Sequence, residues 1–346
     1  MVTARDVAMH AGVSVATVSR VLMGAPHVSP EKRQKVLDAV QALDYRPDQV
    51  ARSLRTRRSN LIALVVSTIE NQFFTEVARA AEQAAIRHGY NLVISNTDEK
   101  LEREQEYFSI LSQQLVAGVI LAPAPGDVAS RRYLFEPAFP VVLINRFLQG
   151  APCPTIVADD AEAAEACVNV LIGEGRRRIG CIMGIPEAST TQRRLRGYEA
   201  ALHQAGLVSP PELRVSGNAT FEGGFRAAMQ LMSLSEPPDA IFVHNNVMTQ
   251  GAVLALQDLG LRWPDDLDLA GFGAFMQARL YQPPLTLISQ PTHAMGERAV
   301  DLLVDLLEHP RPQEAETIVL PCRVVSREEW RDAHQALRGE GTLQAT

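Results

Sequence analysis

The pattern of hydrophobic and polar residues at the start of the chain predicts three short helices. Thr3 and Asp6 have the spacing of a capping box, and Gly12 supplies a turn because glycine adopts positive φ without steric cost. Ser14 can cap a second helix, and V-S-P-E at 28–31 has the features of a third helix start. The apolar residues expected on the inward faces are Val7, Ala8, Ala11, Val18, Val21, Leu22, Val36, Val40 and Leu43. Together these signals predict a helix-turn-helix unit.

The outward face of the second predicted helix carries small or hydroxylated side chains and one arginine. Its members are Val15, Ala16, Thr17, Ser19 and Arg20. Small side chains let the backbone approach base edges, hydroxyls bond phosphates, and arginine can pair with guanine O6 and N7. An ordinary solvated helix face is the alternative interpretation, and these residue types favour DNA reading over it.

From residue 61 onward, short apolar runs alternate with amphipathic segments. The expected strands are 61–66, 91–94, 118–121, 141–144, 178–182, 240–243 and 267–270. The expected helices are 73–88, 101–114, 161–171, 193–203, 247–259 and 297–307. Such alternation predicts parallel sheets with helices on both faces. The length of the pattern predicts two lobes, with a ligand crevice between them at the carboxyl ends of the strands.

Charge is distributed unevenly along the 346 residues. The first sixty residues hold ten Lys and Arg against five acidic residues, a net charge of +5. The other 286 residues hold 23 basic and 35 acidic residues, a net charge of −12. A basic head on an acidic body indicates that only the head contacts a polyanion.

Several classes of protein are disfavoured by what the sequence lacks. No apolar run approaches the ~20 residues that span a bilayer, and the polar N-terminus does not resemble an export signal, so we expect a soluble, cytoplasmic protein. The four cysteines lack metal-ligand spacing, so neither a metal site nor a disulfide framework is expected. No nucleophile elbow, phosphate loop or zinc-protease motif is present, and G-F-G at 271–273 lacks the third glycine of a dinucleotide motif. We therefore expect no enzyme, no catalytic residue and no cofactor.

Residues 4–54 resemble the DNA-binding head of the lactose-repressor family. The resemblance runs without a gap through D-V-A, A-G-V-S-x-x-T-V-S-R-V-L, V-S-P-E, L-x-Y-x-P and A-R-S-L. It implies base contacts from Val15, Ala16 and Arg20, and phosphate contacts from Thr3, Ser14, Thr17 and Ser19. Among these, Arg20 is the residue expected to read a guanine.

Residues 47–60 follow as a linker with helical potential over 47–55. A helix of about two turns is unstable alone, so we expect it to fold only on DNA and against its twin in a homodimer. The resemblance implies that Leu54 wedges into the minor groove, with Ala51 and Arg55 in the same DNA-contacting hinge. A two-fold dimer implies a near-palindromic double-stranded operator with an easily kinked pyrimidine–purine step at its centre.

Residues 61–328 are similar to the regulatory domain of the same family, which looks like a periplasmic sugar-binding protein. The similarity rests on the block 66–123, which includes N-Q-F-F at 71–74, on 174–184 and on S-Q-P at 289–291. It implies two lobes joined by three crossover strands. The domains expected are a head (1–46), a hinge and linker (47–60), a first lobe (about 61–159 plus 290–320), a second lobe (about 160–289 plus 321–328) and a tail (329–346).

The resemblance also implies an effector-binding cleft between the lobes. The positions expected to face the ligand are Phe73, Phe74, Asn145, Asp159, Thr190, Arg194, Asn245 and Gln290. Gly273 stands where most members carry an aspartate, which leaves Arg194 freer to pair with an anion. Ala219 stands where several carry a stacking aromatic. A monosaccharide or sugar acid is therefore expected, with the acid favoured over the neutral sugar and a purine disfavoured.

The expected function is that of an effector-controlled transcriptional regulator, a repressor acting as a homodimer. A solute-binding receptor with the same body is the alternative, and the basic head and lack of an export signal argue against it.

The tail beyond residue 330 has no apolar heptad, so dimers are expected rather than tetramers. The residues leave open whether the effector releases or tightens the DNA complex.

Overall fold

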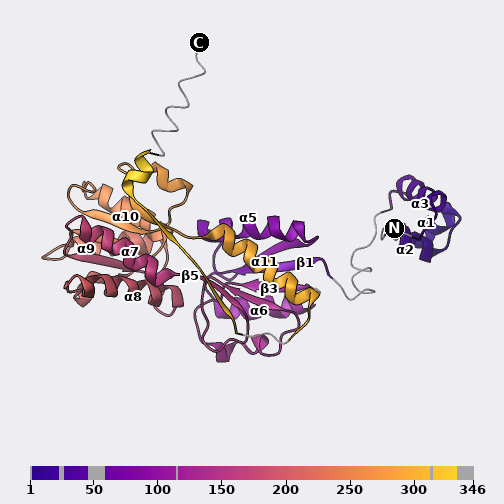
Figure 1. Cartoon of the computed structure of the whole chain (residues 1–346), viewed down its shortest axis with the longest axis horizontal. Helices are drawn as coiled ribbons and strands as arrows, with labels where there is room; N and C mark the ends of the chain where they lie inside the picture. Colours follow the sequence, from indigo (N-terminus) through magenta and orange to yellow (C-terminus); the bar gives the residue numbers. More distant parts are fainter. Residues whose placement is uncertain (1, 23–26, 46–58, 114–115, 312–314, 333–346) are drawn as a thin grey trace, which may run out of the picture. The chain divides into compact units, whose positions relative to one another are not determined.

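The computed structural model describes residues 2–22, 27–45, 59–113, 116–311 and 315–332. The chain forms two compact units, a head (residues 1–59) and a body (residues 60–346), drawn in Figure 1. The predictions for the hinge, including Ala51, Leu54 and Arg55, and for the tail beyond residue 332 lie outside the described residues.

Three helices form the head: α1 (Ala4–Ala11), α2 (Val15–Leu22) and α3 (Pro30–Ala42). The predicted capping box is confirmed, because the Thr3 N–H donates to the Asp6 carboxylate at 2.8 Å and the Asp6 N–H donates to Thr3 Oγ1 at 3.4 Å. Gly12 takes the left-handed conformation between α1 and α2, with φ of 64°. The predicted inward faces meet in one core, to which the described helices contribute Val7, Ala8, Ala11, Val18, Val21, Val36 and Ala39.

The first sheet of the body is parallel and six-stranded, in the order β11-β5-β4-β3-β1-β2. Its strands are β1 (Leu61–Val66), β2 (Asn91–Asn96), β3 (Gly118–Leu121), β4 (Val141–Ile144), β5 (Thr155–Ala158) and β11 (Thr317–Leu320). Helices α5 (Gln72–Arg87) and α11 (Thr292–Glu308) pack on one face, and α6 (Leu101–Gln113) packs on the other. Because both faces are covered, β1 is a nearly continuous apolar run rather than an alternating one.

The second sheet has the order β12-β10-β9-β8-β6-β7, with β12 antiparallel to β10. Its strands are β6 (Ile179–Met183), β7 (Arg214–Ser216), β8 (Ala240–Val243), β9 (Asp268–Phe272), β10 (Thr286–Ser289) and β12 (Arg323–Val325). Helices α7 (Asp160–Gly173) and α8 (Ser189–Gln204) cover one face, while α9 (Phe221–Met232) and α10 (Asn246–Asp258) cover the other. The short 3-10 turns of the body are η1 (Val128–Ser130), η2 (Arg132–Leu134), η3 (Pro211–Leu213) and η4 (Met276–Leu280).

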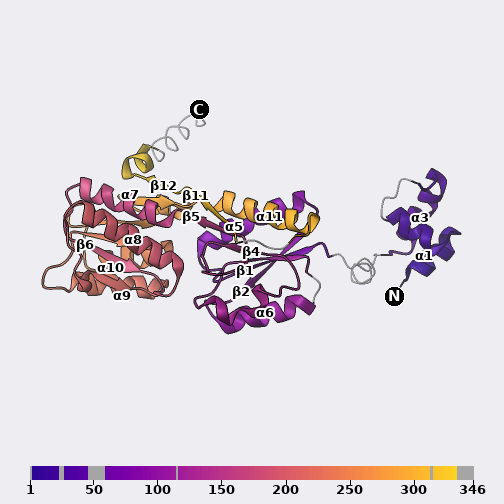
Figure 2. The same ribbon diagram turned by 60° about the horizontal axis from the view of Figure 1, so that its bottom comes forward.

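The chain crosses from one sheet to the other after β5, after β10 and after β11. Figure 2 shows the two sheets as separate layered bodies. The crossings support the proposed division into a first lobe (61–159 plus 290–320) and a second lobe (160–289 plus 321–328). Within the described part of the chain, no helix is long and apolar enough to cross a membrane.

The predicted fold class, a helix-turn-helix head with a two-lobed α/β body, is confirmed. The elements that the sequence pattern did not predict are β5, β7, α9, β10, β11 and β12. The sequence pattern did not predict α9 because of the way this helix packs. Gly223 and Gly224 break the apolar pattern, yet a Cβ on Gly224 would lie 2.3 Å from the Met248 carbonyl oxygen. The glycines therefore let α9 approach α10 closely.

The predicted helix at 73–88 begins one residue earlier, where Asn71 accepts from the Phe73 N–H.

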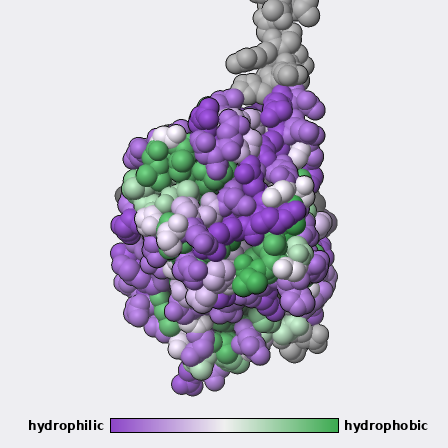
Figure 3. All heavy atoms as spheres, turned by 90° about the vertical axis from the view of Figure 1, so that its left-hand side faces the viewer, coloured by the Kyte–Doolittle hydropathy of each residue, from purple (hydrophilic) through white to green (hydrophobic). Residues whose placement is uncertain are grey.

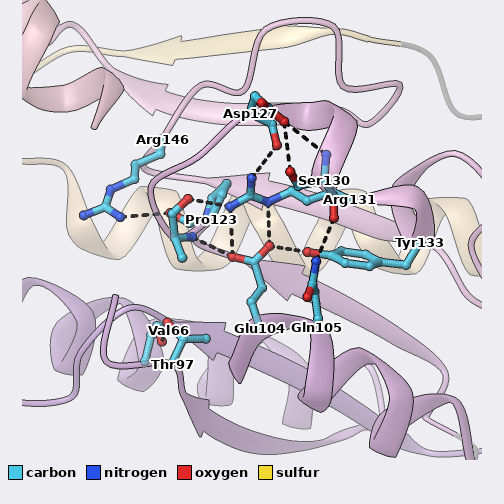
Figure 4. A network of polar contacts seen from close by, with 11 residues as sticks. Val66, Thr97, Glu104, Gln105, Pro123, Asp127, Ser130, Arg131, Tyr133 and Arg146 are labelled. Carbon is cyan, nitrogen blue, oxygen red and sulfur yellow. Dashed lines mark hydrogen bonds and ion pairs between the residues drawn. The ribbon is translucent and has the colours of Figure 1, made fainter. Parts of the chain in front are cut away.

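A buried ion pair organises the first lobe beyond β3. Neither Arg131 nor Glu104 has any exposed side-chain surface, and Arg131 Nε donates to Glu104 Oε1 at 2.7 Å. The backbone of Ala124 serves both partners, since its N–H donates to Glu104 at 2.6 Å and its carbonyl accepts from Arg131 at 2.5 Å. Figure 4 shows Glu104 and Arg131 facing one another within this network. Arg131 also donates to the Asp127 carbonyl, and the Tyr133 hydroxyl donates to Glu104. Buried charges are tolerated only when paired and hydrogen-bonded, so this network depends on all its members.

Replacing Arg131 by methionine would leave the Glu104 carboxylate buried without its cation. We expect the free energy of unfolding to fall by about 3–5 kcal/mol, measured by urea denaturation of the full chain. Arg132→Met is the matched control, because the Arg132 side chain is 86% exposed and lies 3.4 Å from Glu136, so its loss should change stability far less. Equal losses in the two variants would contradict the importance of the buried pair.

Candidate functional site

The outer face of α2 presents the side chains predicted to read bases. Val15, Ala16 and Arg20 are exposed, and Thr17 and Ser19 are half-buried. Residues on one face of a short helix can enter a major groove together. The structure thus brings the predicted base-contacting residues onto one accessible surface of the head.

Three of the four predicted phosphate contacts, Thr3, Ser14 and Thr17, lie at helix starts, and Ser19 lies in the middle of α2. Thr3 caps α1, and Ser14 precedes α2, where Ser14 Oγ accepts from the Thr17 N–H at 3.2 Å. The Ser14 and Thr17 hydroxyls are 2.9 Å apart. Helix N-termini present unpaired backbone N–H groups and a positive dipole end, which suits them to phosphate.

The body contains a cavity that is open to solvent and lined by residues of both lobes, with about 570 Å³ of empty space when the solvent at its mouth is included. Its walls come largely from residues that follow strands, as in Asn145 after β4, His244 after β8 and Gln290 after β10. The predicted ligand-facing residues that line it are Phe73, Phe74, Asn145, Thr190, Arg194, Asn245 and Gln290. Asp159 does not line it. The Asp159 carboxylate instead accepts the Cys322 N–H at 2.6 Å, so it holds the crossover between β11 and β12.

Arg194 is held from three sides in the second lobe. Its Nε and Nη2 lie 2.8 and 2.7 Å from Asp160 Oδ1, and its Nη1 donates to the His244 carbonyl. Its guanidinium carbon stands 3.7 Å from the centre of the Phe272 ring. Burial raises the pKa of the Asp160 carboxyl, and the charge of Arg194 opposes that rise.

The pairing with Asp160 corrects one expectation. The sequence predicts an Arg194 that is freer to pair with an anion because Gly273 replaces an aspartate, but the buried carboxylate of Asp160 already balances its charge. The sequence singled out Asp159 and not its neighbour Asp160, which is the carboxylate that pairs with Arg194. The two adjacent aspartates at the start of a helix that follows a strand were the available signal.

A second ion pair lines the cavity from the first lobe, and it was not predicted. Arg146 donates to both oxygens of Glu99, at 2.6 and 2.7 Å, and to the Pro123 carbonyl at 2.9 Å (Figure 4 shows the contact with Pro123). Glu99, Asn145 and Ala219 all line the cavity with positive φ, at 60°, 69° and 59°. Left-handed backbone at such residues is strained and concentrates at ligand sites. The sequence carried no pattern that joins Glu99 to Arg146, which are 47 positions apart.

Three side chains that line the cavity keep a buried polar atom without a hydrogen-bond partner among the described residues. These atoms are His244 Nδ1, Gln290 Nε2 and Arg146 Nε. Burial, followed by the nearby charge of Arg194, lowers the pKa of His244 to about 3, so the imidazole is neutral at pH 7. Its Nε2 lies 3.3 Å from Cys181 Sγ. Unpaired buried polar atoms are uncommon in proteins, and here they suit a polar ligand.

Two family models match the chain. One, described as periplasmic binding proteins and sugar binding domain of LacI family, matches residues 59–328. The other, described as bacterial regulatory proteins, lacI family, matches residues 3–48. The chain belongs to the LacI family. The resemblance inferred from the sequence is therefore confirmed over both the head and the body.

LacI-family repressors align with nearly the whole chain. The HTH-type transcriptional repressor CytR of Escherichia coli (strain K12) is 35% identical over 308 residues, covering 88% of this chain and 90% of that protein. Catabolite control protein A of Priestia megaterium is 32% identical over 328 residues, covering 94% and 98%. The solved structure of the Lac repressor dimer bound to operator and the anti-inducer ONPF has a TM-score of 0.84 and 28% identity, covering 94% of this chain and 98% of that one. A CelR–cellobiose complex has a TM-score of 0.72 and 29% identity, covering 95% and 100%.

This LacI-family chain is a DNA-binding transcriptional regulator with an effector-binding domain. Its family is made up of DNA-binding transcriptional regulators. The predicted function is confirmed at this level. The two surfaces described above, the outer face of α2 and the cavity of the body, are its candidate sites for DNA and for effector.

Proposed function

We propose that this regulator represses transcription in the cytoplasm as a homodimer on a near-palindromic operator, and that a monosaccharide or sugar acid in the cavity controls it. The observation that carries this proposal is the cavity itself. Residues of both lobes line it, and it lies in the same chain as a basic helix-turn-helix head. A ligand that touches two lobes can bind one of their arrangements better than another and so shift the DNA-binding equilibrium.

The DNA contacts are divided between two roles. Val15, Ala16 and Arg20 read base edges from the exposed face of α2. Phosphates are held by Thr3, Ser14, Thr17 and Ser19. The hinge adds Ala51, Leu54 and Arg55 at the centre of the operator, where the Leu54 side chain opens an easily kinked base step.

Exposed apolar side chains of the second lobe support a homodimer. Met276 and Leu280 lie close together in η4 and are 77% and 78% exposed, so both side chains are available to a partner surface. Figure 3 shows apolar patches within the mostly hydrophilic surface at the second-lobe end of the body. The similar Lac repressor structure is a dimer bound to operator. A two-fold dimer presents two copies of α2 to two half-sites.

The cavity supports a small polyhydroxylated effector. Asn145, Asn245 and Gln290 bring amide groups to its wall, and Phe73 and Phe74 form an edge-to-face pair whose ring centres are 5.0 Å apart. Amides pair with hydroxyls, and aromatic faces cover the apolar side of a sugar ring. The matching family model is described as a sugar binding domain of LacI family.

Removing residues 1–59 should separate the two activities. The remaining body keeps every residue that lines the cavity but loses the basic head. We expect the shortened protein to lose operator binding in a gel-shift assay while keeping its response to the effector in a thermal-shift screen of sugars, sugar acids and purines. A solute receptor predicts no DNA binding by the full chain, and that result would overturn the proposal.

Arg20→Ala should relax base preference at one position in each half-site, since a bidentate contact with guanine contributes about 1–3 kcal/mol of discrimination. Arg55→Ala should instead weaken binding to all sequences and flatten the slope of log affinity against log salt by about one unit. Both are measured by fluorescence anisotropy on operators selected from random DNA. Equal effects of the two changes on base preference would contradict the division of roles.

Arg194→Lys should lower affinity for the effector found in the screen by about tenfold or more, measured by calorimetry. Lysine keeps a charge beside Asp160 but loses the planar fork that fixes Arg194 to Asp160 and to the His244 carbonyl. Arg196→Lys is the control, because Arg196 is exposed on the same helix and does not line the cavity. An unchanged affinity in the folded Arg194 variant would place the effector elsewhere.

A further inference from the structure

We propose that Glu99 determines the charge preference of the cavity and makes it select a neutral sugar over the matching sugar acid. This inference rests on the proposed function, because it requires that the effector binds in this cavity. It assigns to Glu99 and Arg146 a role in specificity that the sequence did not indicate.

The backbone around Glu99 is shaped to bring its carboxylate to the cavity. Asp98 and Glu99 lie between β2 and α6 with φ of 50° and 60°, and the Glu99 N–H donates to the Ser67 carbonyl at 3.1 Å. Two consecutive left-handed residues without a glycine cost free energy. The strain places a carboxylate in the wall of the cavity, beside Arg146.

The charges at the cavity cancel in pairs. Arg146 is matched by Glu99 in the first lobe, and Arg194 is matched by Asp160 in the second. The guanidiniums and Asp160 are nearly buried, and the Glu99 side chain is 22% exposed. A carboxylate entering such a site would lose its hydration without gaining an unmatched cation. Hydroxyl groups carry no such penalty.

Arg146 is fixed independently of Glu99. Its Nη1 also donates to the Pro123 carbonyl, and the next residue, Ala124, is held on both sides by the buried pair of Glu104 and Arg131 (Figure 4). This second anchor keeps the guanidinium in the wall when the charge of Glu99 is removed. The result would be one unmatched cation facing the ligand.

The unpaired atoms suit a neutral sugar. Arg146 Nε and Gln290 Nε2 are donors without partners among the described residues, and both side chains line the cavity. Because these two nitrogens are themselves buried, a sugar hydroxyl can accept from them only when their side chains turn toward the cavity, and it can donate to the lone pairs that Glu99 does not use for Arg146. The cavity wall thus contains both donors and acceptors, and a hydroxyl group can pair with both.

The test measures the full chain at neutral pH against matched pairs that differ only in one carboxylate: D-glucose with D-glucuronate, D-galactose with D-galacturonate, and D-mannose with D-mannuronate. Calorimetry gives the affinity ratio of neutral sugar to acid in each pair. We expect the wild-type protein to favour the neutral member of at least one pair. Glu99→Gln should move that ratio toward the acid by about tenfold, because it leaves Arg146 unmatched. Glu102→Gln is the control, since Glu102 is exposed in the first turn of α6 and does not line the cavity.

The double variant Glu99→Gln with Arg146→Gln restores the balance of charge, and its ratio should return toward the neutral sugar. The proposal is overturned if the wild-type protein favours the acids or binds none of the six compounds. It is also overturned if Glu99→Gln leaves the ratio unchanged, or if the shift persists in the double variant. Operator binding by the wild-type chain is measured in parallel, and its absence would count against the proposed function instead.

Discussion

The pairing of each buried guanidinium with a carboxylate is the constraint on which the body of this regulator depends. Arg194 with Asp160, Arg146 with Glu99, Arg131 with Glu104 and Arg327 with Asp268 are all largely withdrawn from water. A buried ion pair adds little net stability, but an incomplete one costs several kcal/mol. Each pair therefore fixes the position of two chain segments that are far apart in sequence. Two of these four pairs contribute a residue to the cavity wall, so the demand for complete pairing also affects the shape and charge of the candidate ligand site.

The same cavity connects the two lobes. One wall follows strands of the first sheet, and the other follows strands of the second. Direct contacts accompany it: the Phe147 N–H donates to Ser189 Oγ at 2.9 Å, and Phe275, which follows β9, is buried in the core of the first lobe. A ligand in the cavity adds contacts to both walls at once. Its binding free energy therefore depends on the distance between the lobes, which is the condition for coupling ligand to DNA.

Sequence reasoning recovered the parts of the structure that local physics determines. The capping box at Thr3, the turn at Gly12 and the continuous apolar strand β1 follow from residues close together in the chain. The edge strand β7 escaped because it has three residues, is only partly buried and leaves no apolar run to detect. The edge strand β11 does carry a short apolar run, I-V-L at 318–320, but its alternate exposed residues show that only one face is covered. Asp160 and Glu99 escaped for a different reason. Their roles depend on partners 34 and 47 positions away, and no local pattern reports such a pairing.

The separation of charge between head and body limits how an effector can act. The body carries a net charge of −12 and is repelled by DNA, whereas the head and linker carry +5. Affinity for an operator must therefore come from the head and hinge, and the body can change it only through their arrangement. A ligand whose own charge is small cannot act by altering the field at the DNA. It must act through differential contacts with the two walls of the cavity, and by linkage the operator then changes the affinity for that ligand by the same factor. Under the proposed role of Glu99, lobe geometry, and not long-range electrostatics, is the quantity that the effector controls.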